Sequence, residues 1–213
     1  MVPWRFEDWM GWHDAKDGSL FLGVNVEQGR VLDKPNGAQL KTFMSECVDH
    51  HGVNFILTPH QSVLVTDIKP ADKPAIEALM EKHLIKPIEQ VDPLVRLAIA
   101  CPALPLCGLA VSEAERYMPT MVERMSRLLH AMDLGGEEVL MRMTGCPNGC
   151  ARPYMAELAW IGDGKDSYQV YVGGSPVLTN VGFSYKERAK VKHEAADKKV
   201  KDLMSKNKVL QDE

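Results

Sequence analysis

Apolar and polar positions in the N-terminal part of the chain follow the strand period and the helix period in turn. Residues 20–26 form an apolar run of strand length, and residues 38–51 carry apolar side chains at helical spacing. Residues 54–68 predict two strands that are interrupted at Pro59, because proline cannot donate to a strand ladder. A second helix is expected next, with an apolar face that comprises Ile76, Leu79, Met80 and Leu84. This order of strand, helix, strand pair and helix is typical of a ferredoxin-like α+β unit.

Prolines interrupt regular structure across residues 86–110, which is the expected junction between two regions. After it, Ser112-Glu113-Ala114-Glu115 is a capping box and predicts that a helix begins there. Pro119 lies inside the apolar pattern of this helix and is expected to kink or restart it. Strand-like runs follow at residues 138–143, 156–161 and 168–172. The last expected element is a charged helix over residues 185–207.

These elements predict an α+β protein in three parts. Residues 1–92 form the ferredoxin-like half-domain, residues 93–183 an α/β domain, and residues 184–213 a charged helical tail. With 213 residues, of which 45% are hydrophobic and 25% charged, the chain is long enough for one large core or two smaller ones.

Composition and charge exclude several classes of protein. No apolar run approaches the roughly 18 residues that a membrane span needs, so no membrane association is expected. Residues 1–8 lack the apolar core of a signal peptide and the character of a transit peptide, so no targeting segment is expected. The formal net charge of -4 argues against a nucleic-acid partner. The expected location is a reducing compartment, cytoplasm or plastid stroma.

The five cysteines are too few, and odd in number, for a disulfide scaffold, which favours thiolates used as metal ligands. Cys101 and Cys107 are spaced C-x5-C, and Cys146 and Cys150 are spaced C-x3-C. Cys47 stands apart in a helical pattern and is expected to be a core thiol. Four thiolates on loops rich in glycine and proline suit a 4Fe-4S cluster, because such loops leave backbone amides free to donate to sulfur.

Two other interpretations of the cysteines stay open. Structural zinc normally uses C-x2-4-C knuckles, which the second pair fits and the proline-rich first pair does not. Disulfides or plain buried thiols are the other possibility, and the odd cysteine count and the lack of an export signal argue against disulfides.

Longer stretches around the cysteines are informative. The segment from residue 101 reads Cys-Pro-Ala-Leu-Pro-Leu-Cys, and residues 144–157 read Thr-Gly-Cys-Pro-Asn-Gly-Cys-Ala-Arg-Pro-Tyr-Met-Ala-Glu. With Gly11-Trp12-His13 upstream, they closely resemble the ferredoxin-dependent assimilatory sulfite reductases of the siroheme nitrite/sulfite reductase family. The resemblance covers about residues 4–175. The related nitrite reductases differ between the cysteines, so sulfite is the favoured substrate.

The resemblance implies a role for each of the four paired cysteines. Cys101, Cys107 and Cys146 are expected to ligate a 4Fe-4S cluster. Cys150 is expected to ligate the cluster and to bridge it to the siroheme iron, which makes it the catalytic residue. The chain then corresponds to the C-terminal, cluster-bearing half of such an enzyme, and its second region is the siroheme- and cluster-binding domain.

Three further residues are implied in siroheme binding. Asn148 and Arg152 flank the cysteines and are expected to contact siroheme carboxylates, although Asn148 equally suits the turn itself. Relatives usually show Asn-Gln-Asn beside siroheme, where this chain has His60-Gln61-Ser62. Gln61 is therefore the expected contact at that turn.

The resemblance implies six-electron reduction of sulfite to sulfide, with ferredoxin as the donor and the cofactors carrying the chemistry. Family members are much longer, and their N-terminal half supplies most of the cations that bind siroheme and sulfite. A chain of net charge -4 is not expected to balance these anions alone, so an N-terminal sulfite reductase half is the expected partner. The alternatives are a stand-alone 4Fe-4S electron-transfer or regulatory protein, and a non-enzymatic remnant or zinc-stabilised binding module.

Overall fold

The computed structural model describes residues 8–176, 180–185 and 190–192, and it divides the chain into two compact units. The N-terminal unit is Glu7–Asp92, and the C-terminal unit contains Pro93–Glu213. The two units together form a mixed α+β protein, as the sequence predicts. None of the described helices has both the length and the apolar character needed to cross a bilayer.

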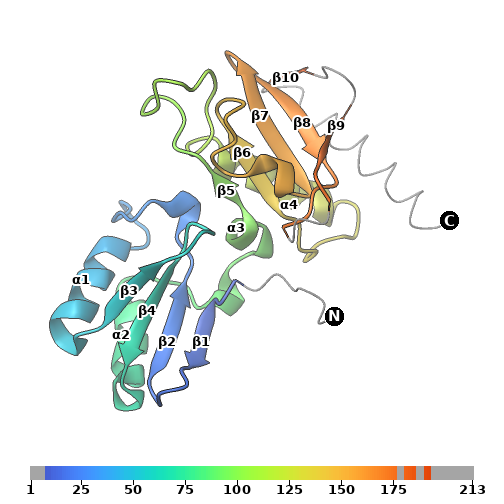
Figure 1. Cartoon of the computed structure of the whole chain (residues 1–213). Helices are drawn as coiled ribbons and strands as arrows, with labels where there is room; N and C mark the ends of the chain where they lie inside the picture. Colours follow the sequence, from blue (N-terminus) through green and yellow to red (C-terminus); the bar gives the residue numbers. More distant parts are fainter. Residues whose placement is uncertain (1–7, 177–179, 186–189, 193–213) are drawn as a thin grey trace. The chain divides into compact units, whose positions relative to one another are not determined.

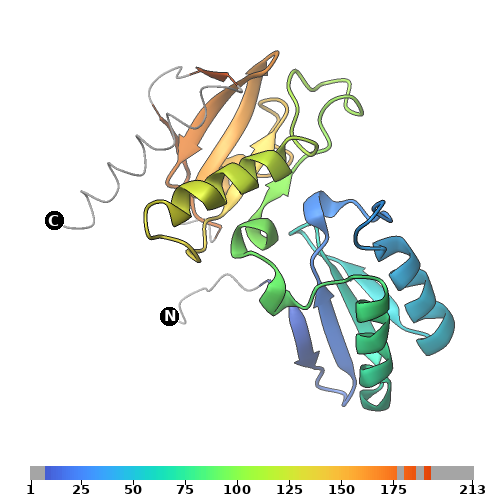
Figure 2. The same cartoon turned by 180° about the vertical axis from the view of Figure 1, so that it is seen from behind.

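The N-terminal unit is a four-stranded antiparallel sheet with two helices on one face (Figures 1 and 2). The sheet has the order β1-β2-β4-β3. Its strands are β1 (Gly11–Asp14), β2 (Leu20–Val24), β3 (Asn54–Leu57) and β4 (Val63–Ile68), and its helices are α1 (Leu40–His51) and α2 (Lys73–Lys82). Apolar side chains of both helices and the inner sheet face form one core, with Phe43, Val65 and Ile76 fully buried. The expected strand, helix, strand pair and helix are confirmed, and β1 is an additional strand.

The end of α2 differs from the prediction. The helix stops at Lys82, and Leu84 adopts a left-handed φ of 55° with 60% of its surface exposed. Ile85 instead donates its N–H to the carbonyl of Met80 and is itself buried. Leu84 is therefore not part of the apolar face of the helix, because the chain reverses at the helix end and places Ile85 in the core instead.

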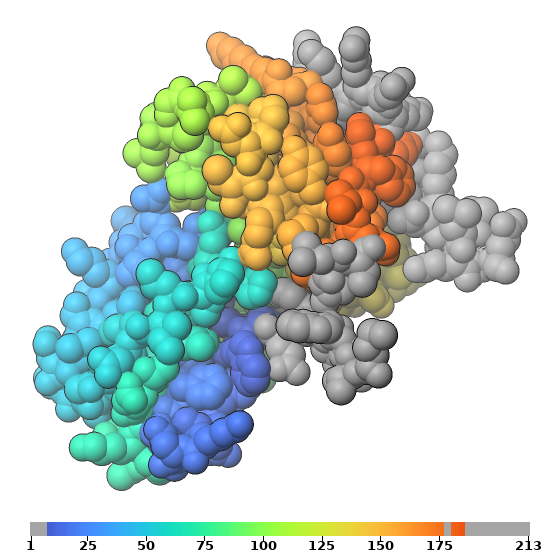
Figure 3. Space-filling model, viewed as in Figure 1, coloured from blue at the N-terminus to red at the C-terminus, as the bar shows by residue number. Residues whose placement is uncertain are grey.

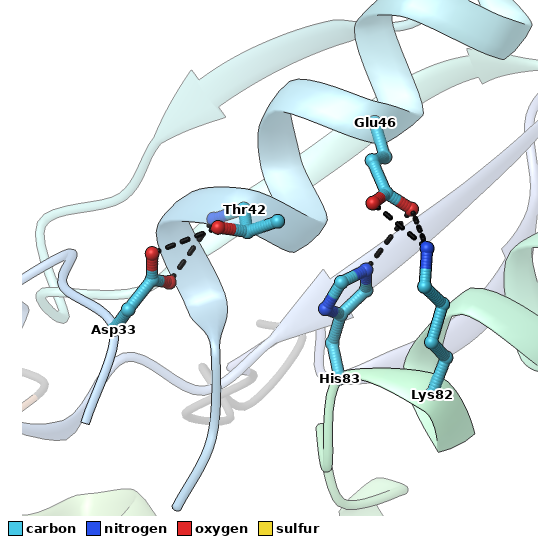
Figure 4. A network of polar contacts seen from close by, with 5 residues as sticks. All are labelled: Asp33, Thr42, Glu46, Lys82 and His83. Atoms are coloured by element: carbon cyan, nitrogen blue, oxygen red, sulfur yellow. Dashed lines mark hydrogen bonds and ion pairs between the residues drawn. The ribbon is translucent and has the colours of Figure 1, made fainter. Parts of the chain in front are cut away.

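A polar network links α1 to its neighbours (Figure 4). Asp33 accepts from the backbone N–H of Thr42 at 3.0 Å, which satisfies a free donor of the first helical turn. On the same helix, Glu46 lies 2.8 Å from the Lys82 ammonium and 3.0 Å from Nε2 of His83. The hydrogen bond from His83, followed by that from Lys82, lowers the pKa of Glu46 to about 2.

This network predicts a pH effect on the N-terminal unit. Because the pKa of Glu46 is lower in the folded state than in the unfolded state, its ionised form contributes stability above about pH 4.5 that is lost as the pH falls toward 2. Glu46→Gln should therefore lower the urea midpoint at pH 7. Near pH 2 the urea midpoints of the variant and of wild type should lie closer together. The control is Glu77→Gln, at an exposed position of α2. If the urea midpoint of Glu46→Gln were equally far below that of wild type at both pH values, the lowered pKa of Glu46 would be contradicted.

The C-terminal unit contains a mixed sheet of order β10-β8-β7-β6-β5, with β9 pairing to β8. Its strands are β5 (Ile99–Ala100), β6 (Met141–Thr144), β7 (Leu158–Gly164), β8 (Ser167–Val172), β9 (Phe183–Ser184) and β10 (Lys190–Lys192). Strands β5, β6 and β7 are parallel, and β8 is antiparallel to β7. Helix α3 (Pro93–Leu97) precedes β5, and α4 (Met118–His130) covers one face of the sheet, as Figure 2 shows.

The start of α4 corrects the capping-box prediction. The helix begins at Met118, six residues after Ser112, so Pro119 lies in its first turn and causes no kink. Proline is compatible with the first turn, where its missing N–H has no helical acceptor. The Ser112 hydroxyl instead donates to the backbone carbonyl of Gly164, and Glu113 pairs with Arg116. Ser112 thus ties the segment before the helix to the β7–β8 hairpin.

The helix expected over residues 185–207 is wrong at Lys190–Lys192, which form β10 beside β8. Most of the rest of that tail lies outside the described residues. The strands expected at residues 138–143, 156–161 and 168–172 are present as β6, β7 and β8, with shifted ends.

Candidate cluster-binding site

Two loops that carry the paired cysteines leave the same edge of the C-terminal sheet. The first cysteine loop (residues 101–107) follows β5, and the second cysteine loop (residues 146–150) follows β6. Strands β5 and β6 are parallel neighbours, with Ala100 opposite Met143. Because parallel strands end at one edge, their pairing brings together two cysteine loops that are about 40 residues apart in the sequence.

Gly145 connects the two loops by hydrogen bonds. Its N–H donates to Sγ of Cys101 at 3.3 Å, and its carbonyl accepts from the N–H groups of Val111 at 2.8 Å and Ser112 at 3.1 Å. A side chain has no room here, because a Cβ atom on Gly145 would lie 2.6 Å from both the Ala103 Cβ and the Ser112 carbonyl oxygen. In the space-filling view of Figure 3, the green segment that contains the first loop lies directly beside the yellow-orange segment that contains the second.

The four cysteines differ in exposure. Cys101 and Cys146 are buried, Cys107 is half-buried, and Cys150 is exposed. Burial raises the pKa of Cys101, the hydrogen bond from Gly145 opposes this shift, and the nearby Cys150 and Cys146 thiols add to it. Cys146 and Cys150 are thus near enough to Cys101 to contribute to the shift of its pKa. All four cysteines are free thiols, so the disulfide interpretation has no support in the structure.

Contacts from the side chains of Tyr154 and Arg142 support the second cysteine loop and the turn that follows it. The Tyr154 hydroxyl donates to the carbonyl of Pro147 at 3.2 Å, and its ring lies against Gly149, where an added Cβ would approach to 3.1 Å. Arg152 adopts a left-handed conformation, with φ 54° and ψ 52°. Nη1 of Arg142, on β6, donates to the Arg152 carbonyl at 2.9 Å. The turn after Cys150 is thus held by a side chain from the strand that precedes it.

The other predicted site residues lie in different settings. Asn148 is exposed in the middle of the second cysteine loop, and Arg152, two residues after the loop, is half-buried. Gln61 belongs to the N-terminal unit, in the turn between β3 and β4, where its φ is 60° and its side chain lies against Gly29. Cys47 is fully buried in α1, and burial raises its pKa to about 12, which confirms a core thiol.

A separate cavity of about 730 Å³ lies in the N-terminal unit. Its walls include Trp12, Met80 and Ile85 from the sheet, α2 and the segment after α2. It contains none of the predicted site residues, and nothing in its lining indicates a ligand.

The donor set and its surroundings fit a 4Fe-4S cluster. Four soft thiol donors on two loops match the ligand requirement of such a cluster, and the Gly145 amide already donates to one of the sulfurs. Within the described ranges, no group of three or more His, Cys, Asp or Glu side chains is close enough to hold a metal ion. Convergence of the four sulfurs on one cluster therefore stays a prediction.

Three residues that support the cysteine loops were not predicted from the sequence: Arg142, Gly145 and Tyr154. Arg142 had a detectable signal, because it is a charged residue between two methionines in a predicted strand, which places it on the opposite sheet face. Gly145 and Tyr154 carried no such signal in the sequence. The role of Gly145 depends on its contact with the first cysteine loop, and that of Tyr154 on its hydrogen bond to the Pro147 carbonyl.

Comparison with known proteins identifies the class of protein. Residues 13–83 match the family described as "Nitrite/Sulfite reductase ferredoxin-like half domain". In addition, 88% of the chain aligns with a reductase of Synechococcus elongatus at 44% identity over 188 residues. The chain belongs to the nitrite/sulfite reductase family.

The Synechococcus elongatus relative is "Sulfite reductase [ferredoxin]", of which the chain covers 30%. The chain is also 39% identical over 188 residues to "Sulfite reductase [NADPH] hemoprotein beta-component" of Myxococcus xanthus, covering 87% of this chain and 33% of the relative. The chain thus spans about a third of the length of these relatives. The solved NirA protein of Mycobacterium tuberculosis shares the fold over 92% of this chain and 36% of that one, with a TM-score of 0.72 and 21% identity.

Proposed function

We propose that this chain is the cluster-bearing part of a ferredoxin-dependent sulfite reductase. In this role Cys101, Cys107, Cys146 and Cys150 hold a 4Fe-4S cluster, and Cys150 also ligates a siroheme iron. The cofactors supply electron transfer and reduction of sulfite to sulfide when bound, and the protein binds and orients them. The higher identity to the ferredoxin-type relative than to the NADPH-type relatives favours ferredoxin as the donor.

One observation carries the proposal: the parallel pairing of β5 and β6 delivers both cysteine loops to the same edge, where Gly145 joins them. The exposure of Cys150 supports its shared role, because a thiolate that ligates both a cluster and a siroheme iron must be open on one side. Asn148, exposed beside it, and Arg152 are the proposed siroheme contacts. Gln61 is proposed as a third contact, from the N-terminal unit.

The remaining cations of the site are proposed to come from an N-terminal sulfite reductase segment. The chain covers only 30% of its ferredoxin-type relative, and its own net charge is -4. Sulfite and the siroheme carboxylates are anions, so a site of this charge needs additional Lys and Arg residues. Ferredoxin and sulfite are thus proposed partners of the completed enzyme.

The test is anaerobic expression of the chain alone and together with a polypeptide that carries the remaining part of the Synechococcus elongatus enzyme. Iron, acid-labile sulfide and siroheme are quantified, and sulfide formation from sulfite is measured with reduced ferredoxin. The proposal predicts cluster in both preparations, but siroheme and activity only in the complemented one. Cluster without siroheme in both would favour a stand-alone electron-transfer protein, and zinc in place of iron would indicate a zinc-binding module.

A further inference from the structure

Arg142 is a cation enclosed in the C-terminal unit. Its side chain has 0% of its surface exposed, and it is among the largest fully buried side chains of the described residues. It lies on β6 between Met141 and Met143, whose side chains belong to the core under α4. Because side chains alternate along a strand, Arg142 points to the opposite face of the sheet.

The guanidinium has only part of the polar contacts it needs. Nη1 donates to the Arg152 carbonyl at 2.9 Å, whereas Nε and Nη2 find no acceptor among the described residues. No carboxylate in the described part of the chain pairs with it. The charge that acts on it is that of Arg152, which is repulsive, and burial together with this repulsion lowers the pKa of Arg142 to about 10.

Such an arrangement is unfavourable in the polypeptide by itself. Burying a charge without a counter-charge is strongly unfavourable, and two unsatisfied N–H donors add to that cost. Thr144, two residues further along the same face of β6, is also fully buried, and its hydroxyl has no partner within the described residues. Arg142 and Thr144 both precede the second cysteine loop. Negative charge or hydrogen-bond acceptors gained at that loop would therefore act on the Arg142 guanidinium.

We infer that Arg142 is the positioning and charge-compensating residue of the cluster site. Its guanidinium holds the Arg152 carbonyl and thereby the turn that follows Cys150. Its positive charge is balanced by the negative charge of the thiolate-ligated cluster, and this charge favours the reduced state of the cluster. The inference rests on the proposed function and adds a residue that sets the electrostatics of the same site.

Three variants separate this role from ordinary packing. Arg142→Met removes the charge and retains an apolar chain, Arg142→Lys retains the charge, and Arg127→Met removes an exposed arginine of α4 as the matched control. Each is prepared anaerobically, with and without iron and sulfide. Thermal unfolding is measured in both states, and the midpoint potential of the cluster is measured by redox titration followed by electron paramagnetic resonance.

Arg142→Met should shift the midpoint potential to a more negative value, because a nearby positive charge stabilises the reduced cluster. It should lower the unfolding temperature of the loaded chain, but leave unchanged or raise that of the cluster-free chain. Arg142→Lys should keep a potential near that of wild type, and Arg127→Met should match wild type in each measurement.

Two results overturn the inference in distinguishable ways. If the wild-type chain loads a cluster and Arg142→Met has the wild-type potential, or destabilises both states equally, then Arg142 has only a packing role and the proposed function stands. If the wild-type chain takes up no iron and sulfide, the proposed function fails, and the role of Arg142 fails with it.

Discussion

Cys146→Ser is expected to reduce the iron and acid-labile sulfide of the anaerobically prepared chain to background. Cys146 is a buried thiol at the end of β6, next to the glycine that joins the two cysteine loops. Loss of a supporting residue around a metal typically lowers metal affinity by about 10- to 100-fold, so loss of a direct thiolate ligand should exceed that range. The measurement is iron and sulfide per chain, together with the visible absorption of the cluster.

The matched control is Cys47→Ala, which removes the one cysteine outside the two loops. Cys47 lies in the core of the N-terminal unit, on α1, and has no place in the proposed site. Its replacement should lower stability modestly while iron and sulfide stay at the wild-type level. Cluster retention by Cys146→Ser, or equal losses in both variants, would contradict the assignment of the ligands.

Gly145→Ala is expected to impair the site without changing any ligand. The added methyl group would lie 2.6 Å from the Ala103 Cβ and from the Ser112 carbonyl oxygen, so the first cysteine loop must move away from the second. Overpacking of this kind typically costs about 1–3 kcal/mol. The displacement should also weaken the hydrogen bond from Gly145 to the Cys101 sulfur. Both the urea midpoint and the cluster content should therefore fall.

Gly108→Ala is the control for this substitution. Gly108 directly follows Cys107, and a Cβ atom there would meet nothing within 4 Å. Its replacement should leave cluster content and the urea midpoint close to those of wild type. Should Gly145→Ala behave like Gly108→Ala, the packing of the two loops against each other would not be needed for cluster binding.

Local features of the sequence predict much of the N-terminal unit. The helix over residues 38–51 ends at Gly52, whose φ of 63° is readily adopted by glycine, and this stop is visible in the sequence. Strand β1 was missed because Gly11-Trp12-His13-Asp14 is too short and polar to show a strand period. Ser112 was misassigned as a helix cap because a capping box describes only local chemistry, whereas its hydroxyl binds the backbone of a hairpin some fifty residues away.

The sequence by itself determined the candidate ligands, because the number, spacing and surroundings of the four paired cysteines are properties of the chain. Tertiary structure alone decided how the two cysteine loops lie against each other, since the register of β5 against β6 and the close contact at Gly145 depend on segments far apart in the sequence. It also decided that Arg142 is enclosed with no counter-charge among the described residues, because burial is a property of the packed sheet rather than of the strand that carries the residue.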